Sequence, residues 1–269
     1  MPPPIRACLF DMDGLLLDSE DLYTICTNII LAEYNRPPLP WSIKAQLQGR
    51  PGPSAAAIFH SWAQLPCTAE EFQAKNSALQ RIHFPKTAPL PGVEDLLRRL
   101  GAAQDAGKTE LALATSSHKA NFELKTGHLQ GLFGVFRAEN RVLGDDARIP
   151  KGRGKPAPDI YLLALETVNA RRRGMGEQRD IKPEECLVFE DSVPGVEAGR
   201  RAGMQVVWCP HPGLLQEYKG REDKVLAGLM GEHKGEEGDD VVVGEVGDGW
   251  AVLLETLEDF PYERFGIEV

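Results

Sequence analysis

Two carboxylates stand one residue apart near the start of the chain, at Asp11 and Asp13. They follow an apolar run, Ile5 to Phe10, that is typical of a short buried strand, and Gly14 behind them supplies the backbone freedom of a tight turn. Like charges this close repel each other strongly in a partly buried site. The pair therefore predicts a bound cation or shifted pKa values at the end of this strand, although an Asp-Xaa-Asp-Gly turn without chemistry would have the same sequence.

Three later stretches carry groups that could act on the same ligand. Thr115 and Ser116 end one apolar run, and Glu190 and Asp191 end another. Lys155 stands in Gly-Lys-Pro-Ala-Pro-Asp, on a loop that leads into a helix. Because ligands of open α/β sheets lie beyond the carboxyl ends of the strands, we expect these groups to meet in one crevice. A hydroxyl, a lysine and clustered carboxylates suit a phosphoryl group together with a divalent cation.

In chain order, the stretches around Asp11, Thr115, Lys155 and Asp191 resemble the first to fourth signature motifs of the haloacid dehalogenase superfamily. The resemblance covers nearly the whole chain. It implies that Asp11 is the nucleophile, which becomes a transient aspartyl phosphate, and that Asp13 is the general acid and base. It also implies that the hydroxyl of Thr115 and the backbone N–H of Ser116 bind phosphate. Lys155 would neutralise the phosphoryl oxygens and the attacking carboxylate.

The same resemblance implies a Mg²⁺ site. Asp191 matches a direct ligand, and Glu190 beside it is a ligand or an acid that supports one. The carboxylate of Asp11 and the backbone carbonyl of Asp13 complete the protein's share. A shell of oxygen atoms with open positions for water and phosphate fits Mg²⁺ better than zinc.

The second acid, Asp13, separates the reaction classes of this superfamily. The dehalogenases lack its equivalent because a halide leaves without a proton, whereas the alkoxide of a phosphate ester needs one. Asp13 therefore indicates a phosphatase or a phosphomutase. The β-phosphoglucomutase branch carries a histidine on its first cap helix, where this chain has Tyr23, so the mutase is the weaker alternative.

A closer resemblance is to the pseudouridine-5′-phosphatase subgroup. Its stretches are Leu113–Ser117, Val142–Asp146, Val188–Asp191, Ala202–Val207 and Leu257–Phe260. The chain departs from the subgroup at Arg50, where a lysine is expected, and in the longer approach to Lys155. Arg50 matches the cap loop that faces the active site and is expected to bind substrate, with a solvated surface arginine as the alternative.

The resemblance implies a small, soluble phosphate ester as substrate. A nucleoside 5′-monophosphate such as pseudouridine 5′-phosphate is the first expectation. Sugar phosphates, glycerol phosphate and flavin mononucleotide are the alternatives within the same chemistry. A non-catalytic phosphate-binding module is a further alternative, which the presence of all four motifs argues against.

Apolar residues recur at helical spacing between residues 18 and 87, and no convincing strand is present there. The clearest case is Leu22, Ile25, Cys26, Ile29 and Ile30. The stretch resembles the helical cap domain of the family, which follows the first motif, closes over the site and excludes water. Strands and helices alternate from residue 88 onward, which predicts a Rossmann-like α/β core with a parallel sheet. The expected domains are a core of residues 1–17 and 88–269 and a cap of residues 18–87.

Four segments of the core are expected from their pattern alone. The apolar run at residues 132–136 predicts a short strand, and the run at residues 205–209 predicts the last strong strand. Residues 169–182, which contain three consecutive arginines from Arg171, and residues 228–249, rich in acids and glycines, are expected to be surface loops. The arginines are interpreted as solvated rather than as an RNA contact, because no aromatic residues interleave them.

Composition restricts the partners and the compartment. The 269 residues are 42% hydrophobic and 26% charged, and the net charge of −10 argues against a general attraction to nucleic acid or to an anionic membrane. The five cysteines are scattered without metal-ligand spacing, which favours reduced thiols in the cytosol. Neither a secretory signal nor an apolar run of about 18 residues is present. We therefore expect a cytoplasmic monomer that acts on a small molecule.

Overall fold

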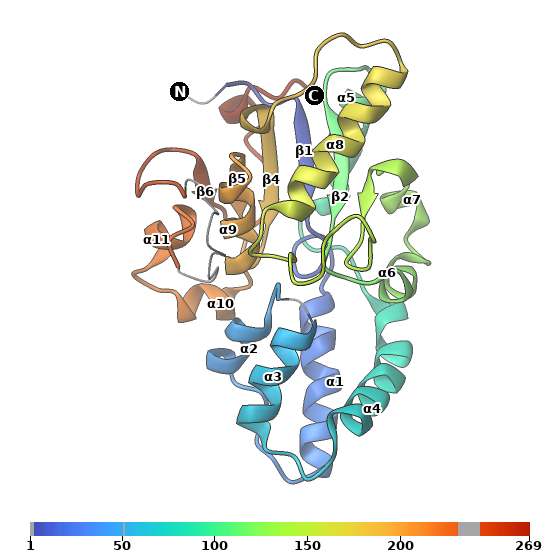
Figure 1. Ribbon diagram of the computed structural model, residues 1–269, viewed down its shortest axis with the longest axis vertical. Helices are drawn as coiled ribbons and strands as arrows, with labels where there is room; N and C mark the ends of the chain where they lie inside the picture. Colours follow the sequence, from blue (N-terminus) through green and yellow to red (C-terminus); the bar gives the residue numbers. More distant parts are fainter. Residues whose placement is uncertain (1–2, 51, 231–242) are drawn as a thin grey trace.

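The computed structural model describes residues 3–50, 52–230 and 243–269 (Figure 1). Its centre is a sheet of six parallel strands in the order β3-β2-β1-β4-β5-β6, which confirms the predicted Rossmann-like α/β fold. The strands are β1 (Ala7–Phe10), β2 (Glu110–Ala114), β3 (Arg141–Val142), β4 (Cys186–Glu190), β5 (Gln205–Trp208) and β6 (Ala251–Leu253). β1 lies in the middle of the sheet, so the residues that follow it reach the centre of the carboxyl edge.

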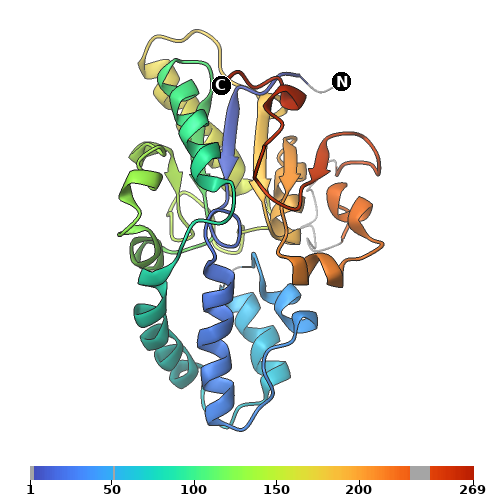
Figure 2. The same ribbon diagram turned by 180° about the vertical axis from the view of Figure 1, so that it is seen from behind.

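Helices cover both faces of this sheet (Figures 1 and 2). The core helices are α5 (Val93–Asp105), α6 (Lys119–Thr126), α7 (Gln130–Phe133), α8 (Asp159–Gly174), α9 (Val193–Arg201), α10 (Pro212–Glu217) and α11 (Glu222–Leu226). Successive side chains of a strand point to opposite faces. Phe10 and Phe189 accordingly pack with α5 and α7, while Leu9 and Val188 pack with α8 and α9. Burial on both faces explains why these strands are continuous apolar runs.

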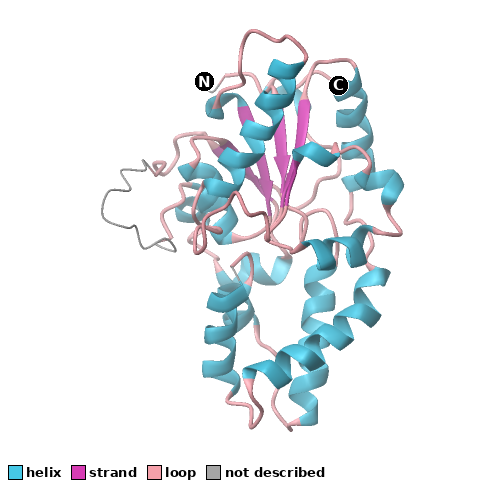
Figure 3. Cartoon of the chain, turned by 45° about the vertical axis from the view of Figure 1, so that its right-hand side comes forward, coloured by secondary structure: helices cyan, strands magenta, loops and turns pink. Residues whose placement is uncertain are grey.

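A helical segment follows the first motif and lies at the carboxyl ends of the strands (Figures 1 and 3). It comprises α1 (Ser19–Glu33), α2 (Trp41–Leu47), α3 (Gly52–Ala63), α4 (Ala69–His83) and the 3₁₀ helix η1 (Phe84–Lys86). It has a small apolar core of its own, formed by Ile30, Leu31, Phe59, Ala63 and Phe72. This arrangement agrees with the expected cap, and the division at residues 17 and 88 remains our interpretation.

The strand predicted at residues 132–136 is wrong. Phe133 ends α7, and the strand of this region is the two-residue β3 farther along the chain. Phe133 and Phe136 are buried on the side of the sheet that faces α5, where the Phe136 ring meets the edge of Phe10 at 5.6 Å. A helix followed by a turn buries these apolar residues as well as a strand would. The apolar pattern therefore could not distinguish a helix from a strand.

The surface loop predicted at residues 169–182 is also wrong over its first part. Helix α8 continues to Gly174 and carries the arginines in its last turn, where the helix dipole favours basic side chains. Arg171 donates to both carboxylate oxygens of Glu110, at 2.7 and 2.6 Å, and Arg172 is buried. The arginines therefore form ion pairs with the protein rather than a solvated cluster.

The acidic, glycine-rich segment at residues 228–249 falls largely on residues 231–242, which lie outside the described part of the chain. Beyond them, Asp248 pairs with the buried side chain of Arg200. Strand β6, which the sequence did not predict, follows directly; it is a short edge strand in which only Val252 is buried. Among the described residues, no helix combines the length and the hydrophobicity that crossing a membrane requires.

Candidate active site

The turn after β1 brings the first motif into contact with the fourth. Asp11 directly follows β1, and the backbone N–H of Gly14 donates to the carbonyl of Leu17 at 3.0 Å to close the turn. Gly14 has a φ of +77°, and a Cβ at this position would clash with the carboxylate of Asp191. A glycine is therefore required here both by the backbone conformation and by the close approach of Asp191.

Lys155 joins the third motif to this pair of strand ends. Its Nζ contacts Oδ1 of Asp11 and lies 2.6 Å from Oε1 of Glu190. Lys155 is only 1% exposed. Burial on its own lowers the pKa of this lysine, but the charges of Asp11 and Glu190 outweigh burial and raise the pKa overall. The lysine is therefore held in its charged form beside the predicted nucleophile.

The carboxylates of Asp11, Glu190 and Asp191 form a buried cluster in which one oxygen of each lies within 4.8 Å of the other two. Burial raises the pKa of Asp11 to about 7; Lys155 opposes this rise and Glu190 adds to it. Burial and the neighbouring acids also raise the pKa of Asp191 well above its usual value. When all three acids are ionised, the single ammonium of Lys155 leaves two negative charges in excess. The donor set and its charge therefore fit a divalent cation bound by oxygen ligands.

Glu190 differs from the other two acids of this cluster. Its Oε1 accepts from the hydroxyl of Tyr161 at 2.5 Å as well as pairing with Lys155. Its Oε2 accepts from the backbone and the hydroxyl of Ser192, each at 3.1 Å. A Cβ at Gly195 would clash with this carboxylate, so the first turn of α9 closes around it. Both oxygens are thus already engaged, which suits an acid that supports a metal ligand.

Without metal, the protein is expected to lose stability as the pH rises from about 4 to 7. Native Asp11 keeps its proton until about pH 7, whereas the unfolded carboxyl loses it near 3.8, so the native state binds more protons across this window. The full difference corresponds to roughly 4 kcal/mol, and Asp191 acts in the same direction. Denaturant unfolding in EDTA measures the slope.

Saturating Mg²⁺ should remove most of this pH dependence, because the cation favours the ionised acids. Asp11→Asn should reduce the slope in EDTA, since the group that titrates is gone. Stability in EDTA that stays level or rises over this pH range would contradict the assignment.

The carboxylate of Asp13 lies in a separate set of donors. Ser19 Oγ donates to Oδ1 at 2.6 Å, and Ser117 Oγ donates to Oδ2 at 2.7 Å. The Nζ of Lys125 also contacts Oδ1. Burial raises the pKa of Asp13, but Lys125 and the two hydroxyls more than offset this, and the pKa is lowered overall. Sequence reasoning missed Lys125 and Ser117, because a lysine in the last turn of a helix and a serine at a strand end are both ordinary.

Thr115 and Ser116 follow β2 and line the same pocket. Thr115 is fully buried, and its Oγ1 accepts from the backbone N–H of Ser117 at 3.1 Å. This hydrogen bond shapes the loop that carries Ser116 and Ser117. The structure therefore brings both predicted phosphate-binding residues to the end of the sheet where Asp11 lies, while their role remains a prediction.

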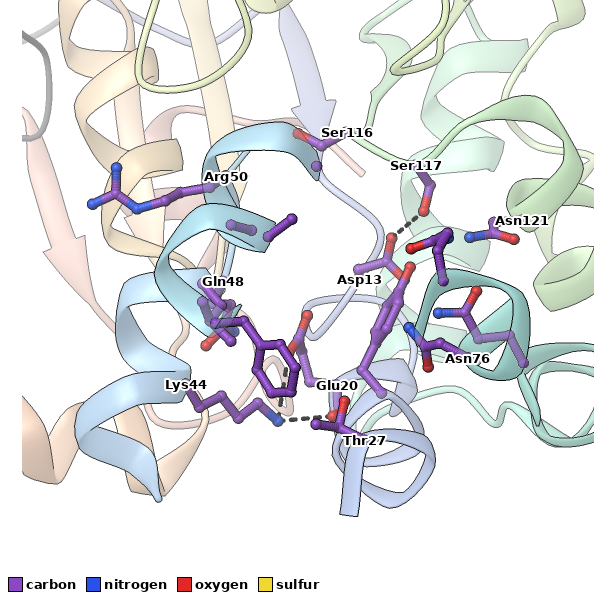
Figure 4. A pocket seen from close by; sticks show the side chains of 18 of the residues that line it. Asp13, Glu20, Thr27, Lys44, Gln48, Arg50, Asn76, Ser116, Ser117 and Asn121 are labelled. Carbon is purple, nitrogen blue, oxygen red and sulfur yellow. Dashed lines mark hydrogen bonds and ion pairs between the residues drawn. The ribbon is translucent and has the colours of Figure 1, made fainter. Parts of the chain in front are cut away.

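A cavity of about 930 Å³ lies between the strand ends and the helical segment (Figure 4). Helix α4 contributes neutral polar side chains at i, i+3, i+4 and i+7, which is one face of the helix. These residues, which we call the α4 polar face, are Gln73, Asn76, Ser77 and Gln80. The cavity is closed on another side by the loop after α2, whose Gln48 donates to Oδ2 of Asp191. A residue of the helical segment thus reaches the acidic cluster itself.

Arg50 lines the cavity but extends away from Asp13 (Figure 4). Its Nε donates to the backbone carbonyl of Gln46 at 2.6 Å, one turn earlier. Gly49 next to it has a φ of +73°, and a Cβ there would clash with Ser192 on the core. Gln48 and Gly49 are therefore the residues of this loop that closely approach the core. Substrate binding by Arg50 stays a prediction.

Comparisons with known proteins agree with this geometry. A family model described as haloacid dehalogenase-like hydrolase matches residues 5–203. The "Probable pseudouridine-5′-phosphatase" of Saccharomyces cerevisiae is 40% identical over 266 residues, which cover 99% of each chain. The (DL)-glycerol-3-phosphatase 1 of Arabidopsis thaliana is 38% identical, over 84% of this chain and 71% of its own. The crystal structure of a HAD hydrolase from Entamoeba histolytica, 19% identical, has the same fold, with a TM-score of 0.66 over 97% of this chain and 98% of its own.

Proposed function

The chain belongs to the haloacid dehalogenase-like hydrolases and is a phosphoric monoester hydrolase, and we propose that it acts through an aspartyl phosphate on Asp11. The resemblance predicted from the motifs is thereby confirmed for the family. The observation that carries the proposal is the meeting of Asp11 and Lys155 beside Asp13, at the end of the cavity formed by the strand ends. This juxtaposition offers a nucleophile, a charge that stabilises the phosphoryl group and a proton donor.

Two steps follow from these groups. In the first, a carboxylate oxygen of Asp11 attacks phosphorus and the phosphorus–oxygen bond to the alcohol breaks. Asp13 gives its proton to the departing alkoxide, which requires that the negative charge of the bound ester offsets the neighbouring donors that lower the pKa of Asp13 in the free protein. In the second, Asp13 takes a proton from water, whose oxygen attacks phosphorus, and the bond between phosphorus and Asp11 breaks. Phosphate leaves and both acids return to their starting states. Lys155 and the loop of Thr115 and Ser116 stabilise the phosphoryl oxygens in both steps.

We propose Mg²⁺ as the divalent cation of the acidic cluster. Asp11, Asp191 and the backbone carbonyl of Asp13 would hold it, and Glu190 would support them, because its oxygens already accept from neighbouring groups. When bound, the cation neutralises charge on the phosphoryl group and on the acids around it. The helical segment would act as a cap that excludes bulk water from this site.

The proposed substrate is a small phosphate ester with an uncharged, hydrogen-bonding leaving group, and pseudouridine 5′-phosphate is the first candidate. The α4 polar face supports this choice, because amides and a hydroxyl suit a base and a sugar better than a second phosphate. A cavity of about 930 Å³ is also wide enough for a nucleoside. Glycerol 3-phosphate is the alternative, in keeping with the name of the Arabidopsis relative. We further propose that the enzyme works as a monomer in the cytoplasm.

Phosphate release from a panel of esters tests this proposal. The panel holds pseudouridine 5′-phosphate, uridine 5′-phosphate, glycerol 3-phosphate, flavin mononucleotide and sugar phosphates, each with Mg²⁺ and with EDTA. We expect release that requires Mg²⁺ and is fastest with pseudouridine 5′-phosphate. Preference for glycerol 3-phosphate would keep the phosphatase and overturn the substrate. A product that retains its phosphate would indicate a mutase, and no release from any ester would overturn the proposal.

Asn76→Leu is expected to weaken use of the nucleoside ester selectively. Oδ1 of Asn76 is buried and has no hydrogen-bond partner among the described residues, so a ligand N–H or O–H would satisfy it. Leaving that ligand group unpaired costs about 1–3 kcal/mol, or roughly a 5- to 150-fold loss of kcat/KM. The loss should be absent with p-nitrophenyl phosphate. Ala78→Leu, on the exposed face of the same helix, is the control, and equal losses with both esters would contradict this role.

A further inference from the structure

We propose that Lys125 is a positioning residue, which holds the carboxylate of Asp13 in the orientation that proton transfer to the leaving group requires. The proposal rests on the proposed function, since it concerns how Asp13 performs its part. It adds a residue that none of the four motifs contains. Lys125 lies near the end of α6 and is fully buried.

The contacts of Lys125 reach both oxygens of Asp13. Its Nζ contacts Oδ1 directly and lies 2.6 Å from Oγ of Ser117, which in turn donates to Oδ2 at 2.7 Å. Ser19 Oγ also donates to Oδ1, at 2.6 Å. Figure 4 shows Asp13 and Ser117 joined in this way at the cavity wall. A carboxylate whose two oxygens are held by three side chains cannot turn freely about its Cβ–Cγ bond.

Lys125 is itself fixed at the junction between the core and the helical segment. Its Nζ lies 3.3 Å from the hydroxyl of Tyr23 on α1 and 5.1 Å from the ring centre of Phe84 in η1. Its backbone carbonyl accepts from Oγ1 of Thr87 at 2.7 Å. Tyr23 and Phe84 flank the two connections that join the helical segment to the core. A shift of the helical segment would therefore change the position of the Lys125 ammonium that contacts Asp13.

Burial of this lysine argues for a chemical role rather than a purely structural one. Lys125 is fully buried, and removing an ammonium from water carries a large penalty that an apolar side chain of the same volume would avoid. The rings of Tyr23 and Phe84 beside it are apolar surfaces, against which a methionine of similar length could pack. A methionine could not replace the polar contacts of the ammonium to Asp13, Ser117 and the Tyr23 hydroxyl. Asp13 is the one charged partner among them, and Ser117 also donates to Asp13, so we place the function of Lys125 there.

The test uses Lys125→Met and two esters with different leaving groups. An alkoxide must be protonated as it leaves, whereas p-nitrophenolate leaves without a proton, so only the alkyl ester needs Asp13 in position during the first step. We expect kcat/KM to fall by roughly 100-fold with the best alkyl ester of the panel and by less than about 10-fold with p-nitrophenyl phosphate. A burst of p-nitrophenol is also expected, because the second step still needs Asp13 as a base and becomes slower.

Lys119→Met, which removes an exposed lysine of the same helix, should leave both esters unaffected. Equal losses with the two esters, or no loss with either, would overturn the proposal. Thermal unfolding confirms that the variant is folded, and if Lys125→Met does not fold, Ser117→Ala tests the same split between the esters. If the wild-type enzyme hydrolyses neither ester, the proposed function fails instead, so the two failures are distinguishable.

Discussion

Asp11→Asn is expected to lower phosphate release by roughly 10⁴-fold or more, because an amide cannot form the aspartyl phosphate. The same change should make the metal-free protein more stable at neutral pH. Asp11 is buried with Glu190 and Asp191, and replacing one of three clustered acids by a neutral side chain of the same shape relieves their repulsion. Phosphate release and denaturant unfolding in EDTA measure the two effects on one preparation.

The opposite signs of these effects separate a catalytic role from a structural one. A variant that lost activity because it unfolded would lose stability as well. Asp105→Asn, at the exposed end of α5 and away from the cavity, is the matched control and should change neither quantity. Full phosphate release by Asp11→Asn would contradict the covalent mechanism, whatever its stability.

Lys155→Met is expected to impair both catalysis and stability. Loss of the charge that faces the phosphoryl oxygens should reduce kcat by roughly 10³-fold. The variant also leaves Asp11 and Glu190 without the buried ammonium that contacts both of them, which should cost about 3–5 kcal/mol of unfolding free energy. Mg²⁺ should recover part of the stability, because it supplies positive charge to the same acids.

Lys151→Met provides the comparison, since Lys151 is exposed on the same loop four residues earlier. We expect it to behave as the wild type in both assays. Equal stability of Lys155→Met and Lys151→Met in EDTA would contradict the charge balance described for the acidic cluster. Unchanged kcat in Lys155→Met would contradict its role toward the phosphoryl group.

The meeting of the four motifs could be predicted from the sequence because each follows or adjoins a strand of one parallel sheet. β1 pairs with β2 on one side and with β4 on the other, so Asp11, Thr115 and Asp191 emerge at neighbouring strand ends. The continuous apolar runs identified these strands, since both faces of the sheet are covered. Neither inference needed a side-chain contact.

The contacts that complete the site could not be predicted, because they join residues that are far apart in the sequence and ordinary in type. In the sequence, Lys125 is an ordinary basic residue at a helix end. It lies 112 positions from Asp13, which it contacts. Gln48 contacts Asp191 across 143 positions. The mistaken strand around Phe133 and the mistaken loop around Arg171 have a related cause, since tertiary packing and the ion pair to Glu110 decided those conformations.

Rapid acid quenching during turnover can trap the proposed aspartyl phosphate on Asp11. The enzyme is mixed with Mg²⁺ and phosphate-labelled p-nitrophenyl phosphate, quenched at successive times, and digested to locate the label. We predict a transient label on the protein, which forms with the burst of p-nitrophenol and maps to the peptide that contains Asp11. Release of product with no label on the protein at any time, or a label on another residue, would contradict the mechanism.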